Sequence, residues 1–93
     1  MARRIFEIDT LAAHDFDHGR VNFRGRENGK VINCSISDEA LQDMSGSIAF
    51  EPDQLLAIFG ANAFDIGEIA EAKLNANALE ADGSIRIRAA DVC

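Results

Sequence analysis

The stretch RVNFRGRENGKVINCSIS, residues 20–37, predicts one β-hairpin and decides the fold. At its centre stands Asn28-Gly29, the dipeptide favoured by a two-residue type I′ turn, in which both central residues have a positive φ. Pairing outward from this turn fixes the register, because a slip of one residue would move every side chain to the other face of the sheet. The turn chemistry and the side-chain pattern therefore predict the same hairpin independently.

This register gives the hairpin an apolar face and a polar face. The cross-strand pairs of the first face are mostly apolar beyond the turn: Glu27–Lys30, Gly25–Ile32, Phe23–Cys34 and Val21–Ile36. Those of the second face are polar and rich in arginine: Arg26–Val31, Arg24–Asn33, Asn22–Ser35 and Arg20–Ser37. We expect the first face to lie against a core and the second to face water.

The segment after the hairpin predicts a first, short helix over residues 38–44. Ser37 precedes it as a suitable N-cap, and acidic residues follow, as the positive end of a helix dipole favours. Ile36 and Leu41 stand at the two positions of a hydrophobic staple. Ser45-Gly46-Ser47 then ends the helix.

Two further helices are predicted, with a bend between residues 60 and 65. One starts at Pro52, because proline suits the first helical position. The other starts at Asp65, since Asp65 and Glu68 resemble a capping box and Phe64 with Ile69 a staple. The positions expected to face inward recur at the helical period: Leu55, Leu56, Phe59 and Ala63, then Ile66, Ile69, Ala70, Leu74 and Ala78.

Residues 84–89 alternate strictly and predict a closing strand, with Ile85 and Ile87 inward and Arg86 and Arg88 outward. A weaker edge strand is expected over residues 4–9, within a weakly ordered lead-in over 1–18. Together these elements predict an α+β fold of two layers: a small antiparallel sheet of three to four strands with helices packed on one face.

Length and composition bound the class of protein. A chain of 93 residues fits one domain over residues 1–93, and 47% hydrophobic with 27% charged residues is typical of a soluble globular protein. No apolar run approaches the roughly 20 residues that span a bilayer, and no signal peptide is apparent, so we expect a cytoplasmic protein. Cys34 falls on the inward parity and Cys93 is the last residue; no disulfide is expected between them.

The net charge of −7 is unevenly distributed. Residues 1–36 carry a net charge of +1, residues 37–82 carry −9, and residues 83–93 carry +1. An acidic domain is a poor candidate for nucleic acid, which rewards positive charge through counterion release. RNA-binding sheets also place aromatic residues outward, whereas Phe23 is expected inward and the chain has no Trp or Tyr.

Several strings are similar to the bacterial family known as domain of unknown function 1488, over roughly residues 15–92. They are VNF at 21–23, NGKVINCSISDEAL at 28–41, Phe59-x-x-Asn62 and Ile66-x-x-Ile69-Ala70-x-x-Lys73. The resemblance implies a small α+β fold in a bacterial protein, with no established activity, cofactor or catalytic residue. Ala63 and Leu74 depart from it, because a basic residue and an aromatic are expected at those positions.

The segment HDFDH, residues 14–18, is the one concentration of side chains that could hold a metal. Two histidines four apart can share a helix face, with carboxylates between them to orient or bind. No third strong ligand stands nearby in the sequence, and Gly19 follows at once. A polar lead-in to the first strand of the hairpin is therefore favoured, and no metal or cofactor is assigned.

Enzyme chemistry finds no support in the motifs. The chain has no nucleophile elbow and no glycine-rich phosphate loop, so no catalytic residue is assigned. The acidic pairs Asp38/Glu39 and Asp65/Glu68 are explained by helix capping. Lys73 is expected to bury its stem and keep its amine in water.

The outward sheet face is the candidate interaction surface, and two interpretations of it stay open. Arginine forks suit carboxylates and phosphates, so the face could bind an anion or a partner; equally, it could be a solvated face whose arginines pair with nearby acids. We expect a non-catalytic interaction or assembly module, whose partner is another protein or a second copy in a homodimer; a regulator that binds a small anion is the alternative. The residues of this surface are Arg20, Asn22, Arg24, Arg26, Asn33, Ser35, Arg86 and Arg88.

Overall fold

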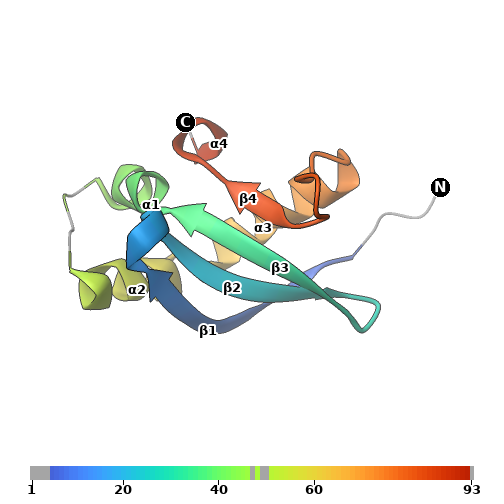
Figure 1. Ribbon diagram of the computed structural model, residues 1–93, viewed down its shortest axis with the longest axis horizontal. Helices are drawn as coiled ribbons and strands as arrows, with labels where there is room; N and C mark the ends of the chain where they lie inside the picture. The colour runs from blue at the N-terminus through green and yellow to red at the C-terminus, as the bar shows by residue number, and fades with distance from the viewer. Residues whose placement is uncertain (1–4, 47, 49–50, 93) are drawn as a thin grey trace.

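A computed structural model describes residues 5–46, 48 and 51–92, and shows helices packed against a four-stranded sheet (Figure 1). The strands follow the order β1-β2-β3-β4 across the sheet. The elements are β1 (Glu7–Asp15), η1 (Phe16–His18), β2 (Arg20–Glu27), β3 (Lys30–Ser37), α1 (Asp38–Ser45), α2 (Pro52–Ala61), α3 (Ala63–Asn75), β4 (Ile85–Ile87) and α4 (Ala89–Val92).

The hairpin of β2 and β3 confirms the predicted register at every pair, from Arg20–Ser37 to Glu27–Lys30. Its turn residues Asn28 and Gly29 have φ of 52° and 83°, the positive values that a type I′ turn requires. Phe23 and Cys34 both lie on the buried face, with 3% and 4% of their surface exposed. The prediction of one apolar and one polar face is therefore confirmed.

The first strand is longer than predicted. An edge strand was expected over residues 4–9 in a weakly ordered lead-in, whereas β1 runs from Glu7 to Asp15 and η1 continues to His18; Arg4 lies outside the described residues. The periodicity is hidden by a bulge: Ile8 pairs with Gly25 and Ala12 with Phe23, so three residues of β1 oppose one residue of β2. Extra residues of this kind break the alternation by which a strand is recognised.

The last strand makes the sheet mixed. The predicted α+β class is confirmed, but β4 pairs with β3 in the parallel direction, through Cys34–Ile85, Ser35–Arg86 and Ile36–Ile87. A parallel pair needs a crossover connection, and α1, α2 and α3 supply it. The three helices lie between β3 and β4 in sequence. In space, α2 and α3 contact the sheet and cover one of its faces (Figure 1).

The helix starts at Ser37 and Pro52 are confirmed. The Ser37 hydroxyl accepts the N–H of Ala40 at 3.0 Å, and Gly46 ends α1 with a left-handed φ of 70°. Ser47, the last residue of the Ser45-Gly46-Ser47 segment expected to end this helix, lies outside the described residues. At the start of α2, the side chain of Gln54 accepts the N–H of Glu51 at 3.4 Å.

The predicted start of α3 at Asp65 is wrong, although the break between α2 and α3 falls inside the expected interval. Helix α3 begins at Ala63, because the backbone N–H of Ile66 already bonds the carbonyl of Asn62 at 2.9 Å. The amide of Asn62 donates to the Ile58 carbonyl at 2.8 Å and so completes the end of α2. This start leaves Phe64 77% exposed, so the staple with Ile69 does not form.

The core lies between the apolar face of the sheet and the helices. The predicted inward positions Leu55, Leu56, Phe59, Ile66, Ile69, Ala70 and Leu74 belong to the core or pack against it. Ala63, at the start of α3, is half-buried and outside this cluster. Ala78 lies past the end of α3 and is exposed. Asn77, with a left-handed φ of 57°, turns the chain away just before it. The core residues that are less than 2% exposed include Val21, Ile36, Leu41, Leu55, Phe59, Ile66, Leu74, Ile85 and Ile87.

Cys34 sits within this core as an inert thiol; Cys93 lies outside the described residues. Burial raises the pKa of the Cys34 thiol from 9.0 to about 12, and its Sγ donates to the Ile32 carbonyl at 3.5 Å. The thiolate that thiol reagents need is therefore scarce in the folded protein at pH 8.

We predict that a Cys93→Ser protein does not react with Ellman's reagent at pH 8 until urea unfolds it. Because the folded pKa lies above the unfolded one, the contribution of Cys34 to stability is complete below pH 9. It is then lost as pH rises from 9 to 12, by up to about 1.4 kcal/mol per pH unit. A Cys34→Ala, Cys93→Ser protein should lack this loss in urea titrations. Stoichiometric labelling of the folded Cys93→Ser protein within minutes would contradict the prediction.

Candidate functional site

The outward face of the sheet is hollowed where a row of small side chains crosses it. The pairings Ala13–Asn22 and Asn22–Ser35 place three short side chains side by side on β1, β2 and β3, and the pair Ser35–Arg86 continues the row to the longer Arg86 on β4. Along β2, the long side chain of Arg20 stands on one side of Asn22 and that of Arg24 on the other. Short side chains between long ones leave a depression, so the pattern of residue sizes accounts for the hollow.

The hollow has a volume of about 680 Å³, and a smaller one of about 360 Å³ adjoins it. Five of the predicted surface residues line the larger hollow: Arg20, Asn22, Arg24, Asn33 and Ser35. The smaller hollow is lined by Arg20, Ser35 and Arg86, among others. Arg26 and Arg88 lie outside both linings, so the structure brings together six of the eight predicted residues.

Carboxylates at the rim neutralise part of this face. The Nε of Arg20 lies 3.5 Å from an oxygen of Asp15, and it is buried without a hydrogen-bond partner among the described residues. The hydroxyl and backbone N–H of Ser84 donate to Asp82 at 2.6 and 2.9 Å. These hydrogen bonds, and the charge of Arg20, hold the pKa of Asp82 below its ordinary value, so Asp82 is ionised at neutral pH.

Three arginines of the face keep their hydrogen-bonding capacity. Arg88 pairs with Glu80 at 3.0 Å, whereas Arg24, Arg26 and Arg86 form no ion pair with any residue that the structure describes. Arg24 and Arg26 are exposed and Arg86 is half-buried. A guanidinium offers five N–H donors, so this face has positive groups to offer to an anion.

Ser35 forms the floor of both hollows. It is 8% exposed and is the one buried polar residue among the described part of the chain. Within that part its hydroxyl has no hydrogen bond to another residue. Its oxygen is not among the fully buried atoms that lack a partner, so the hydroxyl is open to water or to a ligand that enters the hollow.

The sequence alone did not assign the acidic rim. Asp9 and Leu11 reach the larger hollow from the bulge of β1, and Asp82 and Ser84 from the turn before β4. For Asp82 a sequence signal existed: Asp82-Gly83 is a turn signal, and Asp and Ser two residues apart often share a local hydrogen bond. This pattern could have predicted the contact between Asp82 and Ser84. For Asp9 no sequence signal was available, because the bulge disrupts the alternation of the strand.

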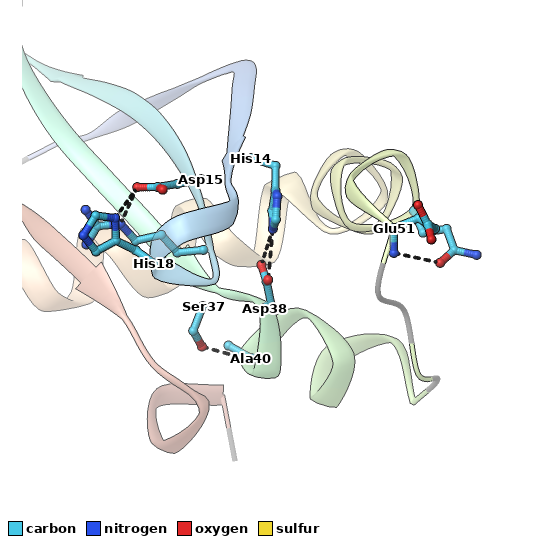
Figure 2. Close-up of polar contacts among 9 residues, drawn as sticks. His14, Asp15, His18, Ser37, Asp38, Ala40 and Glu51 are labelled. Carbon is cyan, nitrogen blue, oxygen red and sulfur yellow. Dashed lines mark hydrogen bonds and ion pairs between the residues drawn. The ribbon is translucent and has the colours of Figure 1, made fainter.

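The two histidines of HDFDH bind different carboxylates and do not converge on one point (Figure 2). The Nε2 of His14 donates to both oxygens of Asp38, at 2.9 and 3.1 Å, and only 6% of the His14 side chain is exposed. His18 contacts Asp15 at 2.9 Å and is 62% exposed. No group of three or more metal-binding side chains occurs among the described residues. His14 instead links the end of β1 to the first residue of α1.

We predict that His14→Ala lowers the free energy of unfolding by about 1–3 kcal/mol, because it leaves the partly buried Asp38 without its partner. His18→Ala is the matched control and should cost less than about 0.5 kcal/mol, since its contact is exposed. Urea unfolding followed by circular dichroism measures both. Equal losses for the two variants would show that the link between β1 and α1 is not stabilising.

The sequence predicted that the amine of Lys73 lies in water, but in the structure the amine has a protein partner. Its Nζ binds Asp91 at 3.0 Å, and the same carboxylate oxygen accepts the N–H of Arg88 at 2.8 Å. Only 16% of the Lys73 side chain is exposed. The side chain of Asn62, between α2 and α3, donates to the backbone of α2. Both residues therefore have structural partners.

Comparisons with known proteins bear on the family and the fold. The model of a family described as "Protein of unknown function (DUF1488)" matches residues 6–87. A crystal structure of a protein of unknown function from the same family, from Shewanella loihica PV-4, is similar with a TM-score of 0.82. The two chains are 24% identical, and the similarity covers 94% of each. No curated protein matches. Among the described residues, no helix is both long enough and apolar enough to cross a membrane.

Proposed function

This chain belongs to the DUF1488 family of proteins of unknown function, and we propose that it is a non-catalytic binding module whose open sheet face receives an acidic segment of a partner protein. The observation that carries the proposal is a polar face on which Asn22, Arg24, Arg26 and Asn33 are exposed, together with three arginines that form no ion pair with any described residue. Those arginines are Arg24, Arg26 and Arg86. We further propose that it acts in the cytoplasm.

The wide spacing of the three arginines without an ion pair among the described residues favours a protein partner. Arg26 lies next to the hairpin turn and Arg86 on the far edge strand, so the positive groups spread beyond either hollow. Exposed Val31, opposite Arg26, and exposed Leu11 add apolar surface near them. Arginines interspersed with apolar side chains are typical of protein interfaces, whereas exposed lysines are depleted there.

The acidic chemistry of the partner follows from charge complementarity. A second copy could supply it, because residues 37–82 carry a net charge of −9. Basic-on-acidic contact between copies would be head-to-tail, however, and such contacts form rings or filaments unless the rotation closes. An acidic segment of another protein avoids this constraint and is the partner that we propose.

A labelled hexaglutamate peptide tests the proposal by fluorescence anisotropy, with hexalysine as the control peptide. The measurement belongs at 0.15 M salt, where the Debye length is about 8 Å, so that the overall net charge of −7 is screened while contacts on the face persist. We expect hexaglutamate to bind and Arg24→Glu, Arg26→Glu, Arg86→Glu together to abolish binding. Binding that is unchanged in the triple variant would refute the proposal.

Light scattering at low and high salt separates self-association from binding to another protein. A particle whose mass rises with concentration at low salt alone would identify the second copy as the partner. A monomer at every concentration in both buffers would remove self-association and leave the acidic partner.

A small-anion regulator is the second candidate, and the larger hollow favours it. Its volume of about 680 Å³ lies within the roughly 300–1,000 Å³ typical of ligand pockets. Its lining is charge-balanced, with Arg20 and Arg24 facing Asp9 and Asp82, which weakens the attraction for a free anion. Inorganic phosphate or citrate that binds wild type but not Arg24→Glu, Arg86→Glu, in the absence of any peptide binding, would select this candidate.

A further inference from the structure

We propose that a single carboxylate of the acidic partner binds above Ser35, where the two hollows adjoin, between Arg24 of the larger hollow and Arg86 of the smaller one. This inference rests on the proposed function and names the contact that anchors it. The other groups of the face would then guide the partner without anchoring it.

The strand register places the three residues around one point. Ser35 is paired with Arg86 on β4 and, on its other side, with Asn22 on β2. Arg24 is two residues from Asn22 on the same face, which makes it a diagonal neighbour of Ser35, at roughly 7–8 Å between backbones. Arginine side chains are long enough to reach a group above Ser35 from both positions.

All three residues have donors to spare. The hydroxyl of Ser35 lies at the floor of both hollows without a hydrogen bond to another described residue. Arg24 lines the larger hollow and Arg86 the smaller one, and neither forms an ion pair within the described chain. A carboxylate can accept about four hydrogen bonds at its two oxygens, which matches a serine hydroxyl between two guanidinium groups.

The acidic rim selects a carboxylate over a phosphate. Asp9 and Asp82 line the larger hollow, and the hydrogen bonds from Ser84 keep Asp82 ionised. A phosphate monoester carries a charge of about −1.5 to −2 at neutral pH, whereas a carboxylate carries −1. The two fixed carboxylates therefore repel a phosphate more strongly than a carboxylate, and this difference in repulsion favours the singly charged group.

Three single variants test the anchor with the hexaglutamate peptide at 0.15 M salt. We expect Arg24→Gln, Arg86→Gln and Ser35→Ala each to weaken binding about tenfold, the typical loss of a hydrogen bond to a charged group. Arg26→Gln is the matched control: Arg26 is on the same face and without an ion pair, but lies outside both hollows, so it should weaken binding less than about threefold. Circular dichroism of each variant confirms that it is folded.

The outcomes separate the anchor from the proposed function. If hexaglutamate does not bind wild type, the proposed function and the anchor both fail. If it binds, but Ser35→Ala and Arg86→Gln bind as tightly as wild type while Arg26→Gln weakens binding, the function stands and the anchor is refuted. In competition, glutarate should displace the peptide at lower concentration than inorganic phosphate; the reverse order would also refute a carboxylate anchor.

Discussion

Replacing Phe59 by alanine is expected to lower the free energy of unfolding by about 3–5 kcal/mol, the usual cost of removing a buried phenyl ring. Phe59 lies on α2 with 1% of its surface exposed, and its ring centroid is 5.0 Å from that of Phe23 on β2. The substitution therefore removes both the buried area and the contact that fixes α2 on the sheet. Small domains have a total stability of about 5–15 kcal/mol, so a large part of it would be lost.

Phe64→Ala is the matched control for this experiment, because the same ring stands five residues later with 77% of its surface exposed. Its expected cost is less than about 0.5 kcal/mol. Urea unfolding curves followed by circular dichroism measure both variants. A loss at Phe64 as large as that at Phe59 would contradict the burial of Phe59 and the exposure of Phe64.

The second large effect is expected at Gly25, where the sheet leaves no room for a side chain. A Cβ built on Gly25 would overlap the ring of Phe6, which is buried with 5% of its surface exposed. Gly25→Ala must therefore displace Phe6 from the core or shift β2, at a cost of about 2–3 kcal/mol. The measurement is again the midpoint of urea unfolding.

Gly60→Ala controls for the removal of a glycine as such. Gly60 lies in α2 with open space around its Cα, so alanine there should stabilise the protein by about 0.5 kcal/mol. If displacement of the ring is the cause at Gly25, Phe6→Leu should cost less in the Gly25→Ala background than in wild type. Additive losses would show that Phe6 and Gly25 do not interact.

The hairpin and most of the core could be predicted because each rests on two local signals that agree. Asn28-Gly29 and the alternation around it specify one register, and the structure has that register at all eight pairs. The N-cap of α1 was predictable for the same reason, since Ser37 and the apolar pair Ile36 and Leu41 mark one boundary.

The features that escaped prediction depend on contacts that exist only in the folded chain, most of them between parts that are distant in sequence. The start of α3 follows from the bonds of Asn62 to α2, and the capping pattern at Asp65 gave no sign of them. The parallel direction of β4 follows from the path of the helices between it and β3. The site was predicted as a set of outward arginines, but its acidic rim comes from the bulge of β1 and the turn at Asp82, which only the tertiary fold brings together.

The bulge of β1 also affects how the molecule behaves at high concentration. An edge strand with a regular row of free N–H and C=O groups is a template on which another chain can add a strand, the first step of amyloid growth. In β1 the row is interrupted between Ile8 and Ala12, and the interruption carries the carboxylate of Asp9. Intermolecular strand addition at this edge would have to begin on two short, separated pieces, so the same irregularity that borders the hollow disfavours aggregation through β1.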